Sequence, residues 1–234
     1  LRLVTSLRRQ GDFEGASKLV DEMIVQKPQW LDLQVEAASL YEEWGASGDG
    51  SNYQKIIVAI DGNGAPGSRG TIWGWNRIAD DFQRSLNARV LSDEKRTEYQ
   101  DRYRDARLRS AAARRQYGLT HPDRAKGKES LDATRRELES FALLTPGVDG
   151  ATKQRFNDLY GKVLADLNLK KADLAWTSAA PTVAQVDPAA DKAAADEPKQ
   201  APHPEPKTSK AASAPSAPTA DGESPTGGND TLLV

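Results

Sequence analysis

The feature that most constrains the fold is a pattern that repeats after 34 positions near the start of the chain. Its members are apolar or small residues that stand in the same order in both copies: Leu3, Val4 and Leu7 in the first, and Ala37, Ala38 and Tyr41 in the second. Gln10-Gly11 likewise corresponds to Trp44-Gly45. Self-similarity of this length indicates a supersecondary unit that buries its apolar face against the next unit.

The residues between the two copies predict a helical hairpin. Gly11 and Asp12 suit a turn and a helix cap, and Pro28 closes the unit because proline cannot continue a helix. The residues that share one face of the second helix are Phe13, Ala16, Val20 and Met23. This pattern resembles the tetratricopeptide repeat family.

That resemblance implies an all-α fold of stacked helical hairpins, an α-solenoid, acting as a protein-protein interaction scaffold. Such arrays bind peptides or protein surfaces in a concave groove lined by the first helix of each hairpin. By analogy, the groove positions of this chain are polar residues on those helices: Gln34, Glu42, Asn76 and Asp80.

The rest of the chain divides into three parts. Residues 1–118 are predicted to form about three hairpins, with loop insertions at 45–52 and 61–70. Residues 119–177 are predicted to form a C-terminal helix pair packed on the repeats. Residues 178–234 hold 9 of the 13 prolines and no aromatic residue, so we expect a disordered tail.

Helices are predicted where apolar residues recur at helical spacing. They cover residues 1–10, the stretch from Asp12 towards Pro28, and 30–44, 53–60, 71–86, 92–117, 126–144 and 150–168. Gly118 is expected to end the helix that Ser92 caps, and that helix is expected to pack along one narrow seam with most of its surface in water. The aromatic residues Trp30, Trp44, Trp73 and Trp75 are expected in the core between hairpins.

Both ends of the chain suggest hypotheses. Leu1 stands inside the first expected helix, so we expect that this is the C-terminal part of a longer protein and that further repeats precede it. The apolar end Leu232-Leu233-Val234 would suit a PDZ-type groove, although short apolar ends are common. The compartment and the oligomeric state are left open.

Composition excludes several kinds of site. The chain has no cysteine, which rules out disulfides, thiolate metal sites and cysteine nucleophiles, and no apolar stretch approaches the length of a membrane span. Asp61-Gly62-Asn63-Gly64 resembles the start of a calcium loop, but Ile72 stands where the bidentate Glu is needed. We therefore expect no metal, no cofactor and no catalytic site.

Charge is unevenly distributed along the chain. Residues 11–83 carry 12 acidic and 5 basic side chains, whereas residues 84–128 carry 6 acidic and 13 basic ones. The alternative function is therefore binding of nucleic acid or another anionic partner through the arginines of 92–117: Arg102, Arg104, Arg107, Arg109, Arg114 and Arg115. The opposing interpretation is a solvated helix whose arginines pair with its own carboxylates, Glu98, Asp101 and Asp105.

His121-Pro122-Asp123 is the sharpest local motif. It resembles the signature of J-domain co-chaperones, in which a basic helix runs directly into the histidine. Here Gly118, Leu119 and Thr120 intervene. The opposing interpretation is an ordinary turn between two helices.

Overall fold

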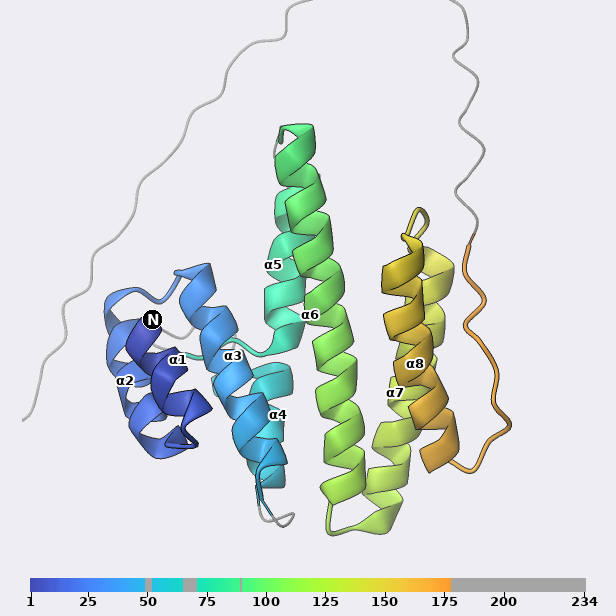
Figure 1. Cartoon of the computed structure of the whole chain (residues 1–234), viewed down its shortest axis with the longest axis horizontal. Helices are drawn as coiled ribbons and strands as arrows, with labels where there is room; N and C mark the ends of the chain where they lie inside the picture. The colour runs from blue at the N-terminus through green and yellow to red at the C-terminus, as the bar shows by residue number, and fades with distance from the viewer. Residues whose placement is uncertain (49–51, 65–70, 89, 178–234) are drawn as a thin grey trace, which may run out of the picture. The chain divides into compact units, whose positions relative to one another are not determined.

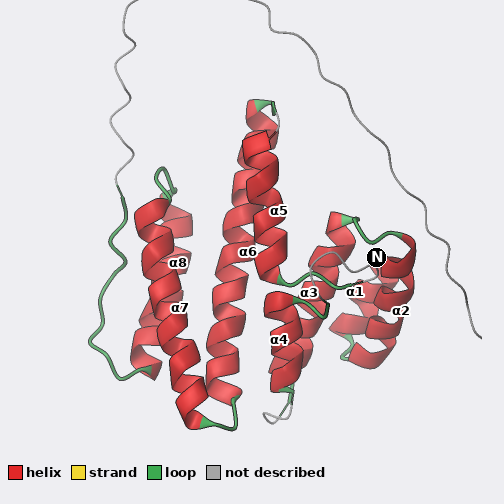
Figure 2. Ribbon diagram, turned by 180° about the vertical axis from the view of Figure 1, so that it is seen from behind, coloured by secondary structure: helices red, strands yellow, loops and turns green. Residues whose placement is uncertain are grey.

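The computed structural model describes residues 1–48, 52–64, 71–88 and 90–177 (Figure 1). Within those ranges it contains helices and loops and no strand, which confirms the all-α class (Figure 2). The helices are α1 (Arg2–Arg9), α2 (Phe13–Gln26), α3 (Leu31–Ala46), α4 (Tyr53–Asp61), α5 (Trp75–Ala88), α6 (Asp93–Thr120), α7 (Arg124–Leu144) and α8 (Gly150–Asp166). The predicted disordered tail and the apolar C-terminus lie outside the described residues.

The helices pack as consecutive hairpins: α1 with α2, α3 with α4, α5 with α6, and α7 with α8. The first helices of the first three hairpins also contact each other in order, α1 with α3 and α3 with α5. One core joins these hairpins, and it buries Tyr41, Trp75 and Phe82, while Phe13 stacks on Trp44 with ring centroids 6.1 Å apart. All four tryptophans expected in the core lie in it or against it.

Polar side chains start several helices as predicted. The carboxylate of Asp12 accepts a hydrogen bond from Gly15 N at 2.9 Å, after a turn in which Gly11 has a φ of +81°. The hydroxyl of Ser92 accepts from Lys95 N at 3.4 Å at the start of α6. These bonds satisfy backbone N–H groups that have no partner inside the helix.

The first loop insertion begins later than its predicted start at Gly45. The repeat pattern placed it at a turn, but α3 continues through it to Ala46. Gly45 is buried because α4 crosses α3 there: a Cβ at this position would lie 2.3 Å from Ile56 Cγ1 and 3.0 Å from Ile56 N. The glycine is therefore needed for close helix packing and not for a turn.

The helix that was predicted over 71–86 begins only at Trp75, so residues 71–74 lie outside it. This short extended segment is buried, with Ile72 and Trp73 at 2 % and 4 % exposure. Backbone groups outside a helix need other partners when they are buried. Asn63 provides one, because its side-chain oxygen accepts from Ile72 N at 2.7 Å.

Helix α6 lies in the middle of the described helices and is not exposed along most of its surface. It packs against α4 and α5 on one side and against α7 and α8 on the other, so the expectation of a mostly solvated helix is wrong (Figure 1). It also runs through Gly118, which is buried against Leu131 of α7, and ends at Thr120. The predicted boundary at residue 118 therefore falls inside a helix.

The second core lies between α6, α7, α8 and the extended segment 169–177. The helical spacing of apolar residues predicts an inward face on both α7 and α8, and all but one of its members are buried: Leu131, Leu138, Phe141, Ala142, Phe156, Leu159, Tyr160, Val163 and Leu164. The exception, Leu167, is only partly buried. Segment 169–177 belongs to the predicted C-terminal unit 119–177, but no helix or strand was predicted for it. Its Leu174 is buried, and its Trp176 packs edge-on against Phe141 and Phe156 at centroid distances of 6.3 and 5.9 Å.

Candidate functional site

Gln34 is not a groove residue, because its side chain is completely buried. Its amide nitrogen donates to Pro28 O at 2.8 Å and to Thr71 O at 3.2 Å, and its amide oxygen accepts from Trp73 N at 2.8 Å. Both ends of the amide are thus used to hold the segment 71–74 against α3. Its role in this fold is structural.

Glu42 is also committed within the fold. Its carboxylate accepts from Trp75 Nε1 at 3.0 Å and pairs with Arg109 at 3.0 Å. Burial raises the pKa of Glu42, and the positive charge of Arg109 and the hydrogen bonds from Trp75 and Arg109 counteract part of that rise. A partner would have to break these contacts to reach the carboxylate.

Asn76 and Asp80 complete the predicted set. The Asn76 amide donates to Asp61 at 2.8 Å and accepts from the Ser110 hydroxyl at 2.7 Å, which links α5 to α4 and α6. Of the four predicted positions, Asp80 alone is exposed. The four residues therefore do not form one accessible surface, and the predicted groove assignment is corrected.

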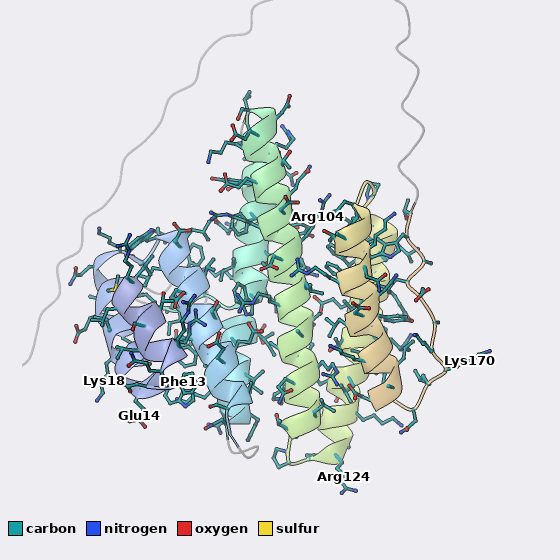
Figure 3. All side chains as sticks on the ribbon, in the orientation of Figure 1. Phe13, Glu14, Lys18, Arg104, Arg124 and Lys170 are labelled. Carbon is teal, nitrogen blue, oxygen red and sulfur yellow. The ribbon has the colours of Figure 1, made fainter. Side chains whose placement is uncertain are left out.

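The structure does contain a groove, on the face of α5 that α3 and α6 flank. We call it the α3–α6 groove, and its volume is about 440 Å³. Its floor is apolar and its rim is charged; the lining residues are Asp32, Val35, Trp75, Ile78, Phe82, Asp101, Arg102, Asp105, Ala106 and Arg155. Figure 3 shows the described side chains of all the helices as sticks on the ribbon.

Two ion pairs cross the rim of this groove. Arg102 of α6 pairs with Asp32 of α3 at 3.2 Å, and Arg155 of α8 pairs with Asp105 of α6 at 2.7 Å. All four side chains are between 44 and 59 % exposed. Exposed pairs of this kind contribute only about 0–1 kcal/mol each. A charged ligand can therefore replace one partner of either ion pair at little cost in free energy.

The arginines of α6 do not form a free basic face. The six that were predicted to bind an anionic partner each pair with a carboxylate: Arg102 with Asp32 and Glu98, Arg104 with Asp101 and Asp149, Arg107 and Arg114 with Glu137, Arg109 with Glu42, and Arg115 with Asp166. Arg109 also lies 4.2 Å from the centre of the Trp75 ring. Most of these carboxylates belong to α3, α7, α8 or the turn before α8, so the arginines join helices together.

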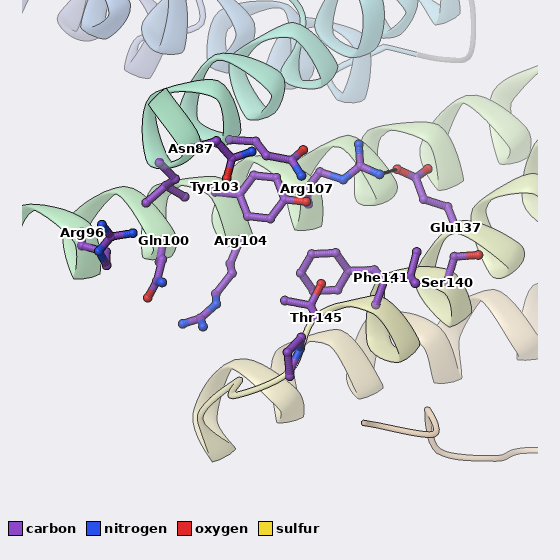
Figure 4. Close-up of a pocket in the computed structure, with 14 residues that line it drawn as sticks. Asn87, Arg96, Gln100, Tyr103, Arg104, Arg107, Glu137, Ser140, Phe141 and Thr145 are labelled. Atoms are coloured by element: carbon purple, nitrogen blue, oxygen red, sulfur yellow. Dashed lines mark ion pairs between the residues drawn. The ribbon is translucent and has the colours of Figure 1, made fainter. Parts of the chain in front are cut away.

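A second hollow lies on another side of α6, between the ends of α5 and α7 (Figure 4). Its volume is about 430 Å³. It brings together three arginines, one carboxylate, several uncharged polar groups and an apolar edge. The residues that the close-up labels are Asn87, Arg96, Gln100, Tyr103, Arg104, Arg107, Glu137, Ser140, Phe141 and Thr145.

His121-Pro122-Asp123 forms the turn between α6 and α7. The His121 ring packs edge-on against Tyr53 and Tyr117, at centroid distances of 5.3 and 5.0 Å, and its Nδ1 accepts from Asp123 N at 2.9 Å. Asp123 caps α7, and the N–H groups of Ala125 and Lys126 lower the pKa of its carboxyl. Pro122 and Asp123 remain exposed.

The described residues contain neither a cluster of metal ligands nor a helix that could span a membrane. Among the residues with described positions, no three or more His, Cys, Asp or Glu side chains gather as metal ligands would. Within the same part of the chain, no helix combines the length and the apolar character that crossing a bilayer requires. In the loop that resembles the start of a calcium site, the side-chain oxygen of Asn63 instead accepts a hydrogen bond from Ile72 N.

The chain matches no family model, no curated protein and no solved structure. Sequence reasoning missed both hollows. One signal was available for the second, since Arg96, Gln100 and Arg104 follow one another at intervals of four and must share a helix face. The sequence contains no corresponding signal for the α3–α6 groove, whose walls come from four different helices.

Proposed function

We propose that this chain is a protein-interaction scaffold that binds a short segment of a partner protein in the α3–α6 groove. The observation that carries the proposal is the groove itself, which combines an apolar floor with a rim of weak, exchangeable ion pairs. The tetratricopeptide-like register at Phe13, Ala16 and Pro28 agrees with such a role. Stacked hairpins of that kind commonly present surfaces for partners.

The chemistry of the groove indicates the kind of segment. An apolar side chain laid against the half-buried Val35, in a groove whose floor residues Trp75, Ile78 and Phe82 are at most 2 % exposed, would lose contact with water, which is worth about 1.5–3 kcal/mol for a residue of the size of Leu. Flanking charges of both signs would replace the partners of Asp32 and Arg102. We therefore expect an amphipathic segment with one apolar anchor between an acidic and a basic residue.

We propose binding and not catalysis at this site. The strongest acidic candidate close to it, Glu42, is held by Trp75 and Arg109. Groups used in this way maintain the position of helices. They are not poised to exchange protons with a substrate, which requires a group within hydrogen-bond reach of the reacting atom.

The test compares two Val→Arg variants of the full chain as baits for partner capture. Val35→Arg places a long cation at the groove, whereas Val25→Arg places the same side chain on α2, where Val25 is 73 % exposed and outside the groove. Thermal unfolding of both baits checks that they fold. We expect Val35→Arg to lose the bound partner and Val25→Arg to retain it. Equal retention by the two folded baits would refute the proposal.

A co-chaperone role is the second candidate, and one observation favours it. Helix α6 runs directly into His121, without the interruption that Gly118 suggested, and α7 returns beside it after Asp123. Stimulation of a chaperone ATPase by the full chain, lost in His121→Gln, would support this role. No stimulation, or stimulation that His121→Gln leaves unchanged, would end it.

A further inference from the structure

The hollow between α5, α6 and α7 exists because α6 is longer than its neighbour. Arg104 Nη2 donates to Gly147 O at 3.3 Å, so this residue is level with the loop that follows α7. The part of α6 before Arg104 continues beyond the end of α7, as Figure 1 shows. One wall of the hollow is therefore this projecting part of α6, and the opposite wall is the end of α7.

Three arginines line this hollow, and neighbouring carboxylates neutralise their charges to different extents. Arg96 is exposed and makes no ion pair within the described residues. Arg104 has only long contacts with carboxylates, 3.3 Å to Asp101 and 3.9 Å to Asp149. Arg107 pairs with Glu137 at 3.0 Å through one terminal nitrogen. The lining thus has more positive than negative charge.

Arg107 also has an unused donor. Its Nε is buried and makes no hydrogen bond with any described residue. A buried N–H group without an acceptor is unfavourable, so a ligand oxygen that reached it would gain a hydrogen bond. The Nε–H of an arginine is one of the donors of its planar fork, which matches the two oxygens of a carboxylate.

The edge of the hollow is apolar. Leu144 lines it and is 81 % exposed, and Leu86 of α5 lies on the opposite side. Amide side chains also line the hollow, among them Asn87 and Gln100 (Figure 4). A ligand with an anionic head and a short apolar body would find matching surroundings for both.

We propose that this hollow is a binding site for a carboxylate attached to a short apolar group. Carboxylate is favoured over phosphate because Glu137 forms part of the wall, and a second negative charge on the ligand would add repulsion against it. The same chemistry occurs in a free organic acid and in an acidic side chain next to an apolar residue of a protein segment. The site shares no lining residue with the α3–α6 groove, so it stands or falls independently of the proposed function.

The test is an NMR titration of the full, ¹⁵N-labelled chain with hexanoate and with neutral hexanol as the matched probe. We expect hexanoate to shift the Nε–H resonance of Arg107 and the backbone amides of 96–107, and hexanol to leave them unchanged. Arg107→Ala should weaken hexanoate binding about tenfold, since it removes a hydrogen bond to a charged group. Arg96→Ala, which breaks no ion pair among the residues whose positions are described, should weaken it about threefold.

Arg136→Ala is the control variant, because Arg136 lies on α7 outside the hollow and is 63 % exposed. An acetylated, amidated Ala-Glu-Leu-Ala peptide and its Gln counterpart separate the two sources. Tighter binding of the Glu peptide than of hexanoate identifies a protein segment, and the reverse order identifies a free acid. The site is refuted if hexanol or the Gln peptide causes the same shifts, if neither acid binds, or if all three variants bind hexanoate equally.

Discussion

Replacing Gln34 by Leu should destabilise the fold far more than its position on a helix suggests. The substitution keeps most of the side-chain volume but removes the acceptor for Trp73 N and the donor to Pro28 O and Thr71 O. Leaving the buried Trp73 N–H without an acceptor costs about 1–3 kcal/mol, and the two lost donations add about 1 kcal/mol, for a total of about 2–4 kcal/mol. Each kcal/mol lowers Tm by about 2–4 °C in a domain of this size, so Tm should fall by about 4–16 °C.

Urea unfolding followed by circular dichroism measures this loss, with Gln154→Leu as the control. Gln154 is exposed on α8 and makes one hydrogen bond, to Asp158 at 2.8 Å. Its replacement should change the free energy of unfolding by less than about 0.5 kcal/mol. If Gln34→Leu proved as stable as Gln154→Leu, the segment 71–74 would not depend on Gln34, and the account of this part of the fold would be wrong.

Three further predictions follow from particular contacts. Gly45→Ala should destabilise the protein by about 1–3 kcal/mol, because its Cβ would collide with Ile56. Gly161→Ala on α8, where the Cβ meets nothing within 4 Å, should instead stabilise it by about 0.5–1 kcal/mol. Denaturant unfolding compares the two variants, and equal effects would contradict the close α3–α4 contact. Burial, together with the hydrogen bond to Glu139, raises the pKa of Tyr160 to about 12, above the unfolded value of about 10. The stability that Tyr160 contributes is therefore complete below pH ~10 and is lost as the pH rises towards 12. The difference in unfolding free energy between wild type and Tyr160→Phe should shrink over that range, and a constant difference would refute the assignment. Because six of the seven arginines of α6 are paired within the fold, we expect no oligonucleotide binding that weakens steeply with salt in a fluorescence-anisotropy titration. A steep decrease would revive the anionic-partner hypothesis.

Local sequence signals predicted most of the helices. Helical spacing and caps involve residues within one turn of each other, so Asp12 and Ser92 marked helix starts correctly, and the inward residues of α7 and α8 were found. The two glycines that misled the prediction, Gly45 and Gly118, are needed for contacts with another helix. A glycine at a helix crossing and a glycine at a turn look the same in a single sequence.

The candidate sites were less predictable because they depend on which helices face each other. Gln34 occupies a groove position in the repeat pattern, yet the connection 71–74 covers it and takes up its amide. Arg109 belongs to a basic stretch, yet its partner Glu42 comes from a different hairpin. Neither contact can be predicted from the spacing of residues along the chain. A count of charges in the sequence therefore predicted a larger unpaired basic surface than the structure has.

Photo-crosslinking from the groove tests the central claim most directly. A benzoylphenylalanine residue is placed at Asp32, on the rim of the α3–α6 groove, and in a second variant at Val25, which is exposed on α2 away from it. If the groove holds the partner segment, irradiation should join the captured partner to position 32 and leave position 25 unlinked. Crosslinking at position 25 but not at position 32 would place the partner on another surface and contradict the account.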